Sequence, residues 1–200
     1  LSFPRNYKHS KIIFLNLEVL LFALDKKNGV ILIGSHFGSF DKLFYAMNEK
    51  NIDLTGVAYK QNNKGADLFF KEIREKFIKN QLYKGGNSRL LSESLSQNNV
   101  LILLSDQDAK NKGTIVKFFN INSSTHSGAA ILSKRNKCPL IYVSITKING
   151  SYEVKFDEIN ASNSVEEIVQ SYTSKIEKTI IRAPEQYFWF HKRWKSVRKY

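Results

Sequence analysis

Three nearly continuous apolar runs constrain the fold of this 200-residue chain more than any other feature. They occupy residues 30–33, 100–104 and 140–145. Valine, isoleucine and leucine dominate each run, which is typical of strands covered on both faces of a sheet. After the third run, Asn149-Gly150 predicts a hairpin into residues 152–156, which places an antiparallel strand beside it.

Apolar residues with helical spacing lie between these runs. The pattern i, i+3, i+4, i+7 is clearest for Phe40, Leu43, Phe44 and Met47. Weaker stripes cross residues 68–78 and 90–95. The clearest helix begins after Ser164, where Glu167 completes a capping box, and Pro184 ends it. Strands that alternate with helices predict an α/β fold with a mixed, mostly parallel sheet flanked by helices.

The composition is that of a globular protein, with 42% hydrophobic and 24% charged residues. No boundary in composition divides the chain, so we expect residues 1–200 to form a single domain. The 31 lysines and arginines exceed the 18 acidic residues, and the formal net charge of +13 predicts an anionic partner. Nucleic acid, an anionic lipid surface and an acidic carrier protein all meet this requirement.

No apolar run reaches the roughly 18 residues that a membrane-spanning helix needs. Residues 12–24 come nearest, but Asn16 and Glu18 interrupt them. The single cysteine, Cys138, lies in an apolar stretch and is expected to be a buried packing residue, which fits a cytosolic compartment.

The segment GSHFGSFD at residues 34–41 is the most informative in the chain. It lies where the first predicted strand ends and the first predicted helix begins, and ligands of α/β sheets gather at that edge. His36 and Asp41 are five positions apart, which on a continuous helix is about 500° of rotation and separates their faces. With His36 in the turn and Asp41 in the first helical turn, the two side chains can face each other across the bend. Gly34 and Gly38 give the backbone the freedom for such a bend.

This pair predicts acid–base chemistry. A neutral imidazole at His36 can take the proton from an alcohol that attacks a carbonyl, and a carboxylate on the other ring nitrogen fixes the tautomer. Ser35 and Ser39 do not match the Gly-x-Ser-x-Gly nucleophile motif, so no covalent enzyme intermediate is required. Backbone N–H groups at residues 38–40 are candidates to hold the oxyanion. The alternative is that His36 is a structural turn histidine.

A second polar turn, Ser105-Asp106-Gln107-Asp108, follows a buried strand and should project over the same sheet edge. It could bind a metal, a sugar hydroxyl or a basic group, or it could be an ordinary polar turn. Two acids without a neighbouring histidine make a poor metal site, so we expect no metal. No phosphate-binding loop, dinucleotide fingerprint or zinc-ligand spacing is present in the sequence.

Together these motifs resemble the bacterial lipid A late acyltransferases, a branch of the glycerolipid acyltransferase superfamily. That superfamily is marked by a histidine, four further residues and then an acid. Four blocks match in order, at residues 29–41, 84–91, 104–119 and 183–195. The resemblance covers nearly the whole chain. It implies a glycerolipid acyltransferase-like fold and transfer of an acyl chain from acyl carrier protein to a hydroxyl of a Kdo-bearing lipid A precursor, without a cofactor.

The resemblance assigns residues by position. His36 and Asp41 match the catalytic pair, and the residues that match substrate-binding positions are Lys60, Arg89, Asp106, Gln107 and Asp108. Several positions depart from the family, among them Ser39-Phe40 in place of Asn-Trp and Gln61 in place of Pro. Asp41 stands where the family usually has Glu, and Lys60 stands where it usually has Arg, which alone can form a bidentate fork to phosphate. These departures leave the reaction class intact and keep another phospholipid or glycolipid open as the acceptor.

The same resemblance sets the expected partners and location. The donor is an acyl thioester of acyl carrier protein or coenzyme A, and the acceptor lies in an anionic membrane. We expect lipopolysaccharide biosynthesis at the cytoplasmic face of the inner membrane, with the chain held peripherally or by an N-terminal anchor that this sequence lacks. A basic nucleic-acid-binding module is the rival hypothesis. It explains the charge but not His36, Asp41 or the Asp-Gln-Asp turn, so we expect no nucleic acid.

Basic and aromatic residues alternate at the end of the chain. The residues are Trp189, Lys192, Arg193, Trp194, Lys195, Arg198, Lys199 and Tyr200. This pattern is typical of segments in the lipid headgroup region, and it predicts that the tail holds the domain at an anionic membrane. A solvated tail is the alternative. His191, in the same segment, is expected to be a surface or packing histidine.

Overall fold

The computed structural model describes residues 11–58, 63–75, 78, 80–83 and 88–198. Within these ranges a seven-stranded sheet has the order β1-β9-β8-β2-β5-β3-β4. The strands are β1 (Ile12–Leu15), β2 (Val30–Gly34), β3 (Leu54–Ala58), β4 (Asn80–Tyr83), β5 (Val100–Leu104), β8 (Leu140–Ile148) and β9 (Ser151–Ile159). All neighbours are parallel except the β8–β9 pair, so the sheet is mixed and mostly parallel, as predicted.

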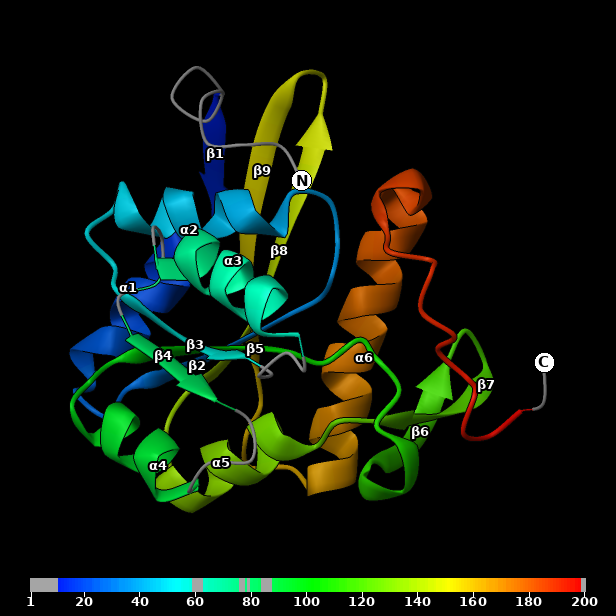
Figure 1. Cartoon of the computed structure of the whole chain (residues 1–200). Coiled ribbons are helices and arrows are strands. Elements are labelled where there is room, and N and C mark those ends of the chain that lie inside the picture. The colour runs from blue at the N-terminus through cyan, green and yellow to red at the C-terminus, as the bar shows by residue number, and fades with distance from the viewer. Residues whose placement is uncertain (1–10, 59–62, 76–77, 79, 84–87, 199–200) are drawn as a thin grey trace.

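Helices cover both faces of this sheet (Figure 1). They are α1 (Leu17–Asp25), α2 (Phe40–Asn48), α3 (Lys64–Glu75), α4 (Ser88–Ser96), α5 (Gly128–Asn136) and α6 (Val165–Arg182). Alternate residues of the central strands point to opposite faces of the sheet and pack into two separate hydrophobic cores. On β2, Ile31 packs with residues of α5 and α6, whereas Leu32 packs with residues of α1 and α2. The near-continuous apolar runs therefore reflect strands buried on both faces.

The strongest sequence signals are confirmed. The three apolar runs form β2, β5 and β8, and Asn149 and Gly150 have φ angles of 48° and 79° in the predicted hairpin turn. Ser164 and Glu167 form both hydrogen bonds of the capping box that begins α6. The 12–24 run divides into β1 and α1 at Asn16, whose φ is 58°. Among the described residues, no helix combines the length and apolar character needed to cross a membrane.

The carboxyl ends of β2 and β5 meet at one edge of the sheet. The two strands pair in parallel with Gly34 opposite Leu104, and the Ser105 N–H donates to the Gly34 carbonyl at 3.1 Å. The turns that leave these strands therefore start side by side. A small hairpin of β6 (Thr114–Phe118) and β7 (Ile121–Thr125) follows. The segment after α6 runs back beside this hairpin (Figure 1) and contacts both β7 and the turn that follows β5.

Candidate active site

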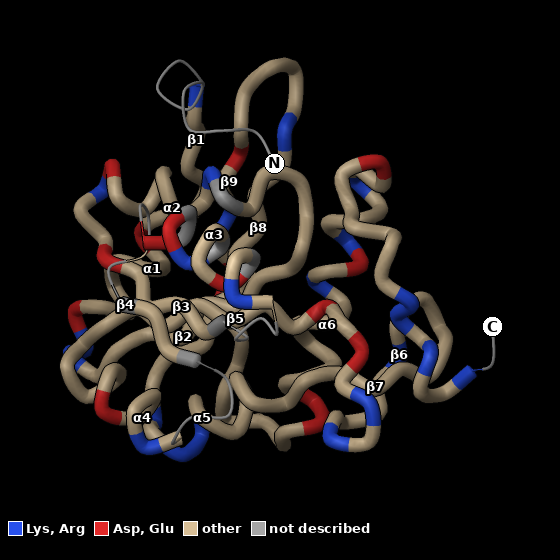
Figure 2. Tube along the Cα trace, in the orientation of Figure 1, with Lys and Arg blue, Asp and Glu red and all other residues tan. Residues whose placement is uncertain are grey.

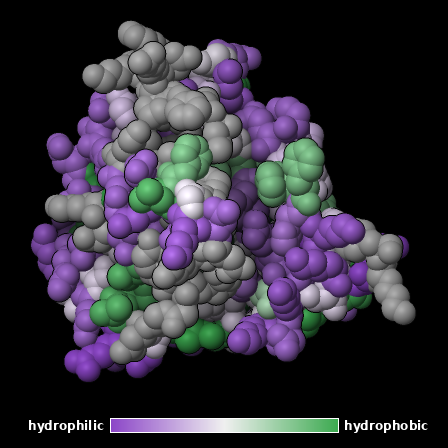
Figure 3. Space-filling model, in the orientation of Figure 1, coloured by the Kyte–Doolittle hydropathy of each residue, from purple (hydrophilic) through white to green (hydrophobic). Residues whose placement is uncertain are grey.

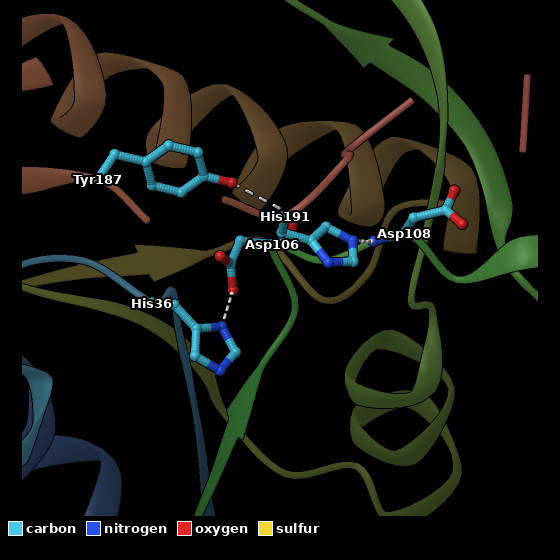
Figure 4. A network of polar contacts seen from close by, with 5 residues as sticks. All are labelled: His36, Asp106, Asp108, Tyr187 and His191. Atoms are coloured by element: carbon cyan, nitrogen blue, oxygen red, sulfur yellow. Dashed lines mark hydrogen bonds and ion pairs between the residues drawn. The ribbon is translucent and has the colours of Figure 1, made fainter. Parts of the chain in front are cut away.

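His36 and Asp106 form the central contact of the site. His36 lies in the turn between β2 and α2, and Asp106 follows β5. The His36 Nδ1 and Asp106 Oδ1 atoms are 2.8 Å apart (Figure 4). The Asp106 side chain is only 2% exposed, whereas that of His36 is 28% exposed. A carboxylate can only accept, so this contact requires a proton on Nδ1, and in a neutral ring Nε2 then carries the lone pair.

Asp41, the predicted partner of His36, lies in the first turn of α2 as expected. Its side chain is outside the described residues, so its contact with His36 stays a prediction. Asp106 was expected beside the site as a substrate-binding residue, and the structure places its carboxylate on the His36 ring instead of leaving it free. The local spacing could not indicate this contact, because it joins residues separated by 70 positions and depends on the pairing of β2 with β5.

Asp108, two residues further along the same turn, is also buried, with 6% exposure. Ser196 Oγ donates to its carboxylate at 2.6 Å, and its own backbone N–H donates to His191 Nε2 at 2.9 Å. His191, which was expected to be a surface or packing histidine, is partly buried, and its ring accepts a hydrogen bond from the backbone beside the site (Figure 4). Burial, aided by the Lys195 charge, lowers the pKa of His191 below its ordinary value.

The segment that follows α6 also binds the His36 turn. The Phe188 N–H donates to the His36 carbonyl at 3.1 Å, and the Gly38 N–H donates to the Gln186 carbonyl at 2.6 Å. Gly38 has a φ of 54°, which glycine adopts without strain. Because its N–H is already used, Gly38 is not an available oxyanion donor, and that part of the sequence prediction was wrong. The N–H groups of Ser39 and Phe40 remain as candidates.

Two residues of the predicted membrane tail, Arg193 and Trp194, pack against the β6–β7 hairpin. Arg193 is 3% exposed, donates to the Ser124 carbonyl at 2.6 Å and also bonds Thr125 Oγ1. The Trp194 ring packs against Phe118, with 5.5 Å between ring centroids. The Arg193 guanidinium is therefore not available to lipid headgroups, whereas Trp194 is partly buried by its packing against the β6–β7 hairpin. The alternation of basic and aromatic residues in the sequence could not distinguish Arg193 and Trp194 from their exposed neighbours. Their partners lie on β6 and β7, far away in the chain.

The exposed part of this segment is basic and aromatic. Figure 2 shows that lysines and arginines recur along the chain after α6. Lys192, Lys195 and Arg198 are exposed there. Trp189 and Phe190 are 51% and 90% exposed. Lys199 and Tyr200 lie outside the described residues.

Apolar side chains flank the His36 ring. Phe40 makes an edge contact with it at 5.7 Å, and Phe188 lies 6.4 Å away on the other segment, measured between ring centroids. Figure 3 shows apolar side chains gathered over α2 and α3 and over the segment that follows α6, with polar surface between them. The exposed apolar residues of these elements include Leu68, Phe69, Phe188 and Phe190.

The remaining predicted site residues are Gln107, Arg89 and Lys60. Gln107 is partly buried in the turn between Asp106 and Asp108. Arg89 lies in the first turn of α4, is exposed, and its Nε donates to Glu93 Oε1 at 2.7 Å. Lys60 lies outside the described residues. Across the part of the chain that the structure describes, no group of three or more His, Cys, Asp and Glu side chains is placed to bind a metal.

Comparison with known proteins identifies the family. The sequence model of the bacterial lipid A biosynthesis acyltransferases matches residues 4–196. The chain is 27% identical over 187 residues to a lipid A biosynthesis palmitoleoyltransferase of Escherichia coli strain K12, with 90% of this chain covered. A lipid A biosynthesis acyltransferase of Shigella flexneri matches equally well. The chain spans about 60% of the length of these two relatives.

A solved structure supports the fold. The 1-acyl-sn-glycerophosphate acyltransferase PlsC of Thermotoga maritima matches with a TM-score of 0.50 and 12% sequence identity, over 89% of this chain and 74% of that one. The predicted glycerolipid acyltransferase-like architecture is therefore confirmed. With its sequence matched almost from end to end, the chain belongs to the bacterial lipid A biosynthesis acyltransferase family.

Proposed function

We propose that this chain transfers a fatty acyl group from an acyl thioester to a hydroxyl of a lipid A precursor or a related membrane glycolipid, with His36 as the general base. The observation that carries the proposal is the contact between His36 Nδ1 and the buried Asp106 carboxylate at 2.8 Å. A buried carboxylate on one nitrogen leaves the other as a proton acceptor, which is the arrangement that activates a hydroxyl. Membership of an acyltransferase family supports the choice of reaction.

In the proposed reaction, His36 takes up one proton and later releases it. His36 Nε2 takes the proton of the acceptor hydroxyl as its oxygen attacks the thioester carbonyl carbon. The tetrahedral intermediate collapses by breaking the carbon–sulfur bond, and the proton on His36 passes to the leaving thiolate. The products are an ester and a free thiol, and no acyl group is attached to the protein. Asp106 stabilises the imidazolium during the cycle without itself taking the proton.

Three further features complete the proposed centre. The backbone N–H groups of Ser39 and Phe40, at the start of α2, are suited to stabilise the oxyanion, because a helix N-terminus carries a partial positive charge. Asp41 lies in the first turn of α2, and we propose that its carboxylate supports His36 or the acceptor hydroxyl beside Asp106. The aromatic rings of Phe40 and Phe188 flank His36 and suit a hydrocarbon chain beside the reacting carbonyl.

The proposed partners follow from charge. A net charge of +13 suits acyl carrier protein, which is acidic, and also the anionic coenzyme A, so either can carry the donor thioester. Lys60, Arg89, Gln107 and Asp108 keep their proposed substrate-binding roles, with Asp108 acting through the turn that it stabilises. We place the chain at the cytoplasmic face of the inner membrane, where Lys192, Lys195 and Arg198 contact anionic headgroups.

Mass spectrometry of host lipids tests the proposal. Cells that express the chain should contain a lipid heavier than its precursor by one acyl chain, and cells that express His36→Ala at an equal level should not. A new mass on lipid A supports the proposed acceptor, whereas a new mass on a phospholipid would replace it with the alternative acceptor. Identical lipid profiles, combined with no transfer from either acyl thioester by the purified chain, would contradict the proposed function.

A further inference from the structure

Three backbone N–H groups of the turn that carries Asp106 are hydrogen-bonded, and the Tyr187 hydroxyl donates to the Asp106 carbonyl at 3.5 Å. The Ser105 N–H donates to the Gly34 carbonyl, and the Ala109 N–H donates to the Ser124 carbonyl, each at 3.1 Å. Between them, the Asp108 N–H donates to His191 Nε2 at 2.9 Å. The first two acceptors are backbone carbonyls of β2 and β7, whereas the third is a side chain on the segment after α6 (Figure 4). His191 is therefore the one side chain among these three acceptors.

A backbone N–H can only donate, so this bond fixes the protonation state of His191. Its Nε2 must carry a lone pair, and a neutral ring then has its proton on Nδ1. The charged groups that act on the ring are Lys195, Arg193, Asp106 and Asp108. The pKa of His191 lies below its ordinary value, chiefly because of burial, which favours the neutral form that the bond requires.

Hydrogen bonds on both sides of His191 in the chain hold it in place. On one side, the Phe188 N–H donates to the His36 carbonyl, and on the other, buried Arg193 binds Ser124 and Thr125. The segment between these anchors is short, so the ring has little freedom to leave Asp108. The same segment thus contacts the turn of His36 through its backbone, and it contacts the turn of Asp106 through the side chains of His191 and Tyr187.

From this arrangement we propose that His191 is a positioning residue: its neutral ring holds the Asp108 peptide and thereby sets the Asp106 carboxylate against His36. Asp106 is two residues from the peptide that His191 holds, and a displacement of about 1 Å at a reacting group can cost about 10²-fold in rate. The inference rests on the proposed function for its effect on rate. Its effect on the His36 tautomer does not depend on that function.

Two substitutions separate positioning from packing. His191→Leu fills similar space but leaves the Asp108 N–H without an acceptor, whereas His191→Gln supplies a carbonyl oxygen near the place of Nε2. His126→Leu is the matched control, because it removes a histidine at the end of the β6–β7 hairpin, outside the catalytic turns. Circular dichroism and thermal unfolding establish that each variant is folded.

The first readout is ¹⁵N NMR of the histidine rings in the full chain. In the original protein, His36 and His191 should both show a protonated Nδ1 and an unprotonated Nε2, with a scalar coupling between the Asp108 nitrogen and His191 Nε2. In His191→Leu the His36 nitrogens should shift toward a mixture of tautomers, and in His191→Gln and His126→Leu they should not. A protonated His191 Nε2 in the original protein would overturn the proposal, even if the leucine variant fails to fold.

The second readout is acyl transfer to lipid vesicles. We expect His191→Leu to lower kcat by about 10²-fold with little change in KM, and His191→Gln to recover most of that loss. If glutamine and leucine are equally impaired while both are folded, or if the His36 tautomer is unchanged in the leucine variant, the positioning role is wrong. If the original protein transfers no acyl group, the proposed function fails and the NMR result still decides the role of His191.

Discussion

His36 and Asp106 are separated by 70 positions in the chain, yet their side chains meet at 2.8 Å. The parallel pairing of β2 and β5 produces this contact, because Gly34 and Leu104 end their strands opposite each other. Asp106 is almost fully buried, so its negative charge is directed at the imidazole with little competition from water.

Replacing Asp106 by Asn tests this contact. Asn keeps the shape of the side chain but removes the charge and the tautomer preference, so acyl transfer should fall by about 10²–10⁴-fold. Asp25→Asn, at the exposed end of α1, is the matched control and should retain full activity. Rates are measured with acyl thioester and lipid vesicles. A folded Asp106→Asn protein with the activity of the control would show that this carboxylate does not serve His36.

The two acidic candidates can be separated by a double-mutant comparison. If Asp106 and His36 act as one unit, Asp106→Asn combined with His36→Ala should be little slower than the slower single variant. Asp41→Asn should also reduce transfer severely if Asp41 supports His36, and Asp41→Glu should be mild because the family usually has Glu at that position. If the loss of rate in the Asp106 and His36 double variant equals the product of the two single losses, the two residues act independently.

The exposed and buried cations of the C-terminal segment should behave differently. Replacing Lys192, Lys195 and Arg198 by Gln should weaken binding to anionic vesicles by about 1 kcal/mol for each cation near the surface, with little change in thermal stability. Added salt should weaken the binding of the original protein likewise. Sedimentation with vesicles measures the binding. Unchanged binding by the triple variant would exclude this segment as the membrane contact.

Arg193→Gln should instead lower stability. Arg193 is 3% exposed and binds Ser124 and Thr125, and each lost hydrogen bond to a charged group costs about 1.5–3 kcal/mol. Thermal unfolding should therefore show a lower Tm for Arg193→Gln and no comparable change for Lys192→Gln. Equal Tm values for the two variants would mean that the buried guanidinium does not hold the segment.

The stability of the protein should depend on pH through His191. Its pKa is lower in the folded protein than the ordinary value of 6.5, so the unfolded chain binds a proton first as the pH falls. The contribution of His191 to stability is present above pH 6.5 and declines below it, until the folded protein also takes up the proton. His191→Gln should lose less stability than the original protein over that interval. Parallel plots of Tm against pH would contradict this assignment.

The sequence predicted the parts of the fold that depend on local pattern. β2, β5, β8 and the capping box of α6 follow from apolar runs and from Ser164 with Glu167. β3 and β4 were not predicted, because their short stretches mix polar and apolar residues and take their strand form from neighbours in the sheet. The β6–β7 hairpin was missed because Phe119 and Asn120 adopt positive φ in its turn without the usual glycine.

In the candidate site, too, local pattern predicted which residues matter but not which of them are in contact. The strand-to-helix turn marked His36, and the position after a buried strand marked Asp106 and Asp108. The bond from Asp106 to His36 could not be predicted, because it requires the strand order. His191 and Arg193 could not be distinguished from their exposed neighbours, since their partners lie on residues that only the folded chain brings near.

The proton transfer by His36 is the central claim, and one substitution tests it most directly. Acyl transfer to a lipid acceptor is measured for the original protein, for His36→Ala and for His126→Ala as a matched control, with circular dichroism to confirm folding. The account predicts that His36→Ala loses about 10²–10⁴-fold in rate, while the control keeps its rate. A folded His36→Ala protein that transfers acyl groups at nearly the original rate would contradict both the mechanism and the location of the active site.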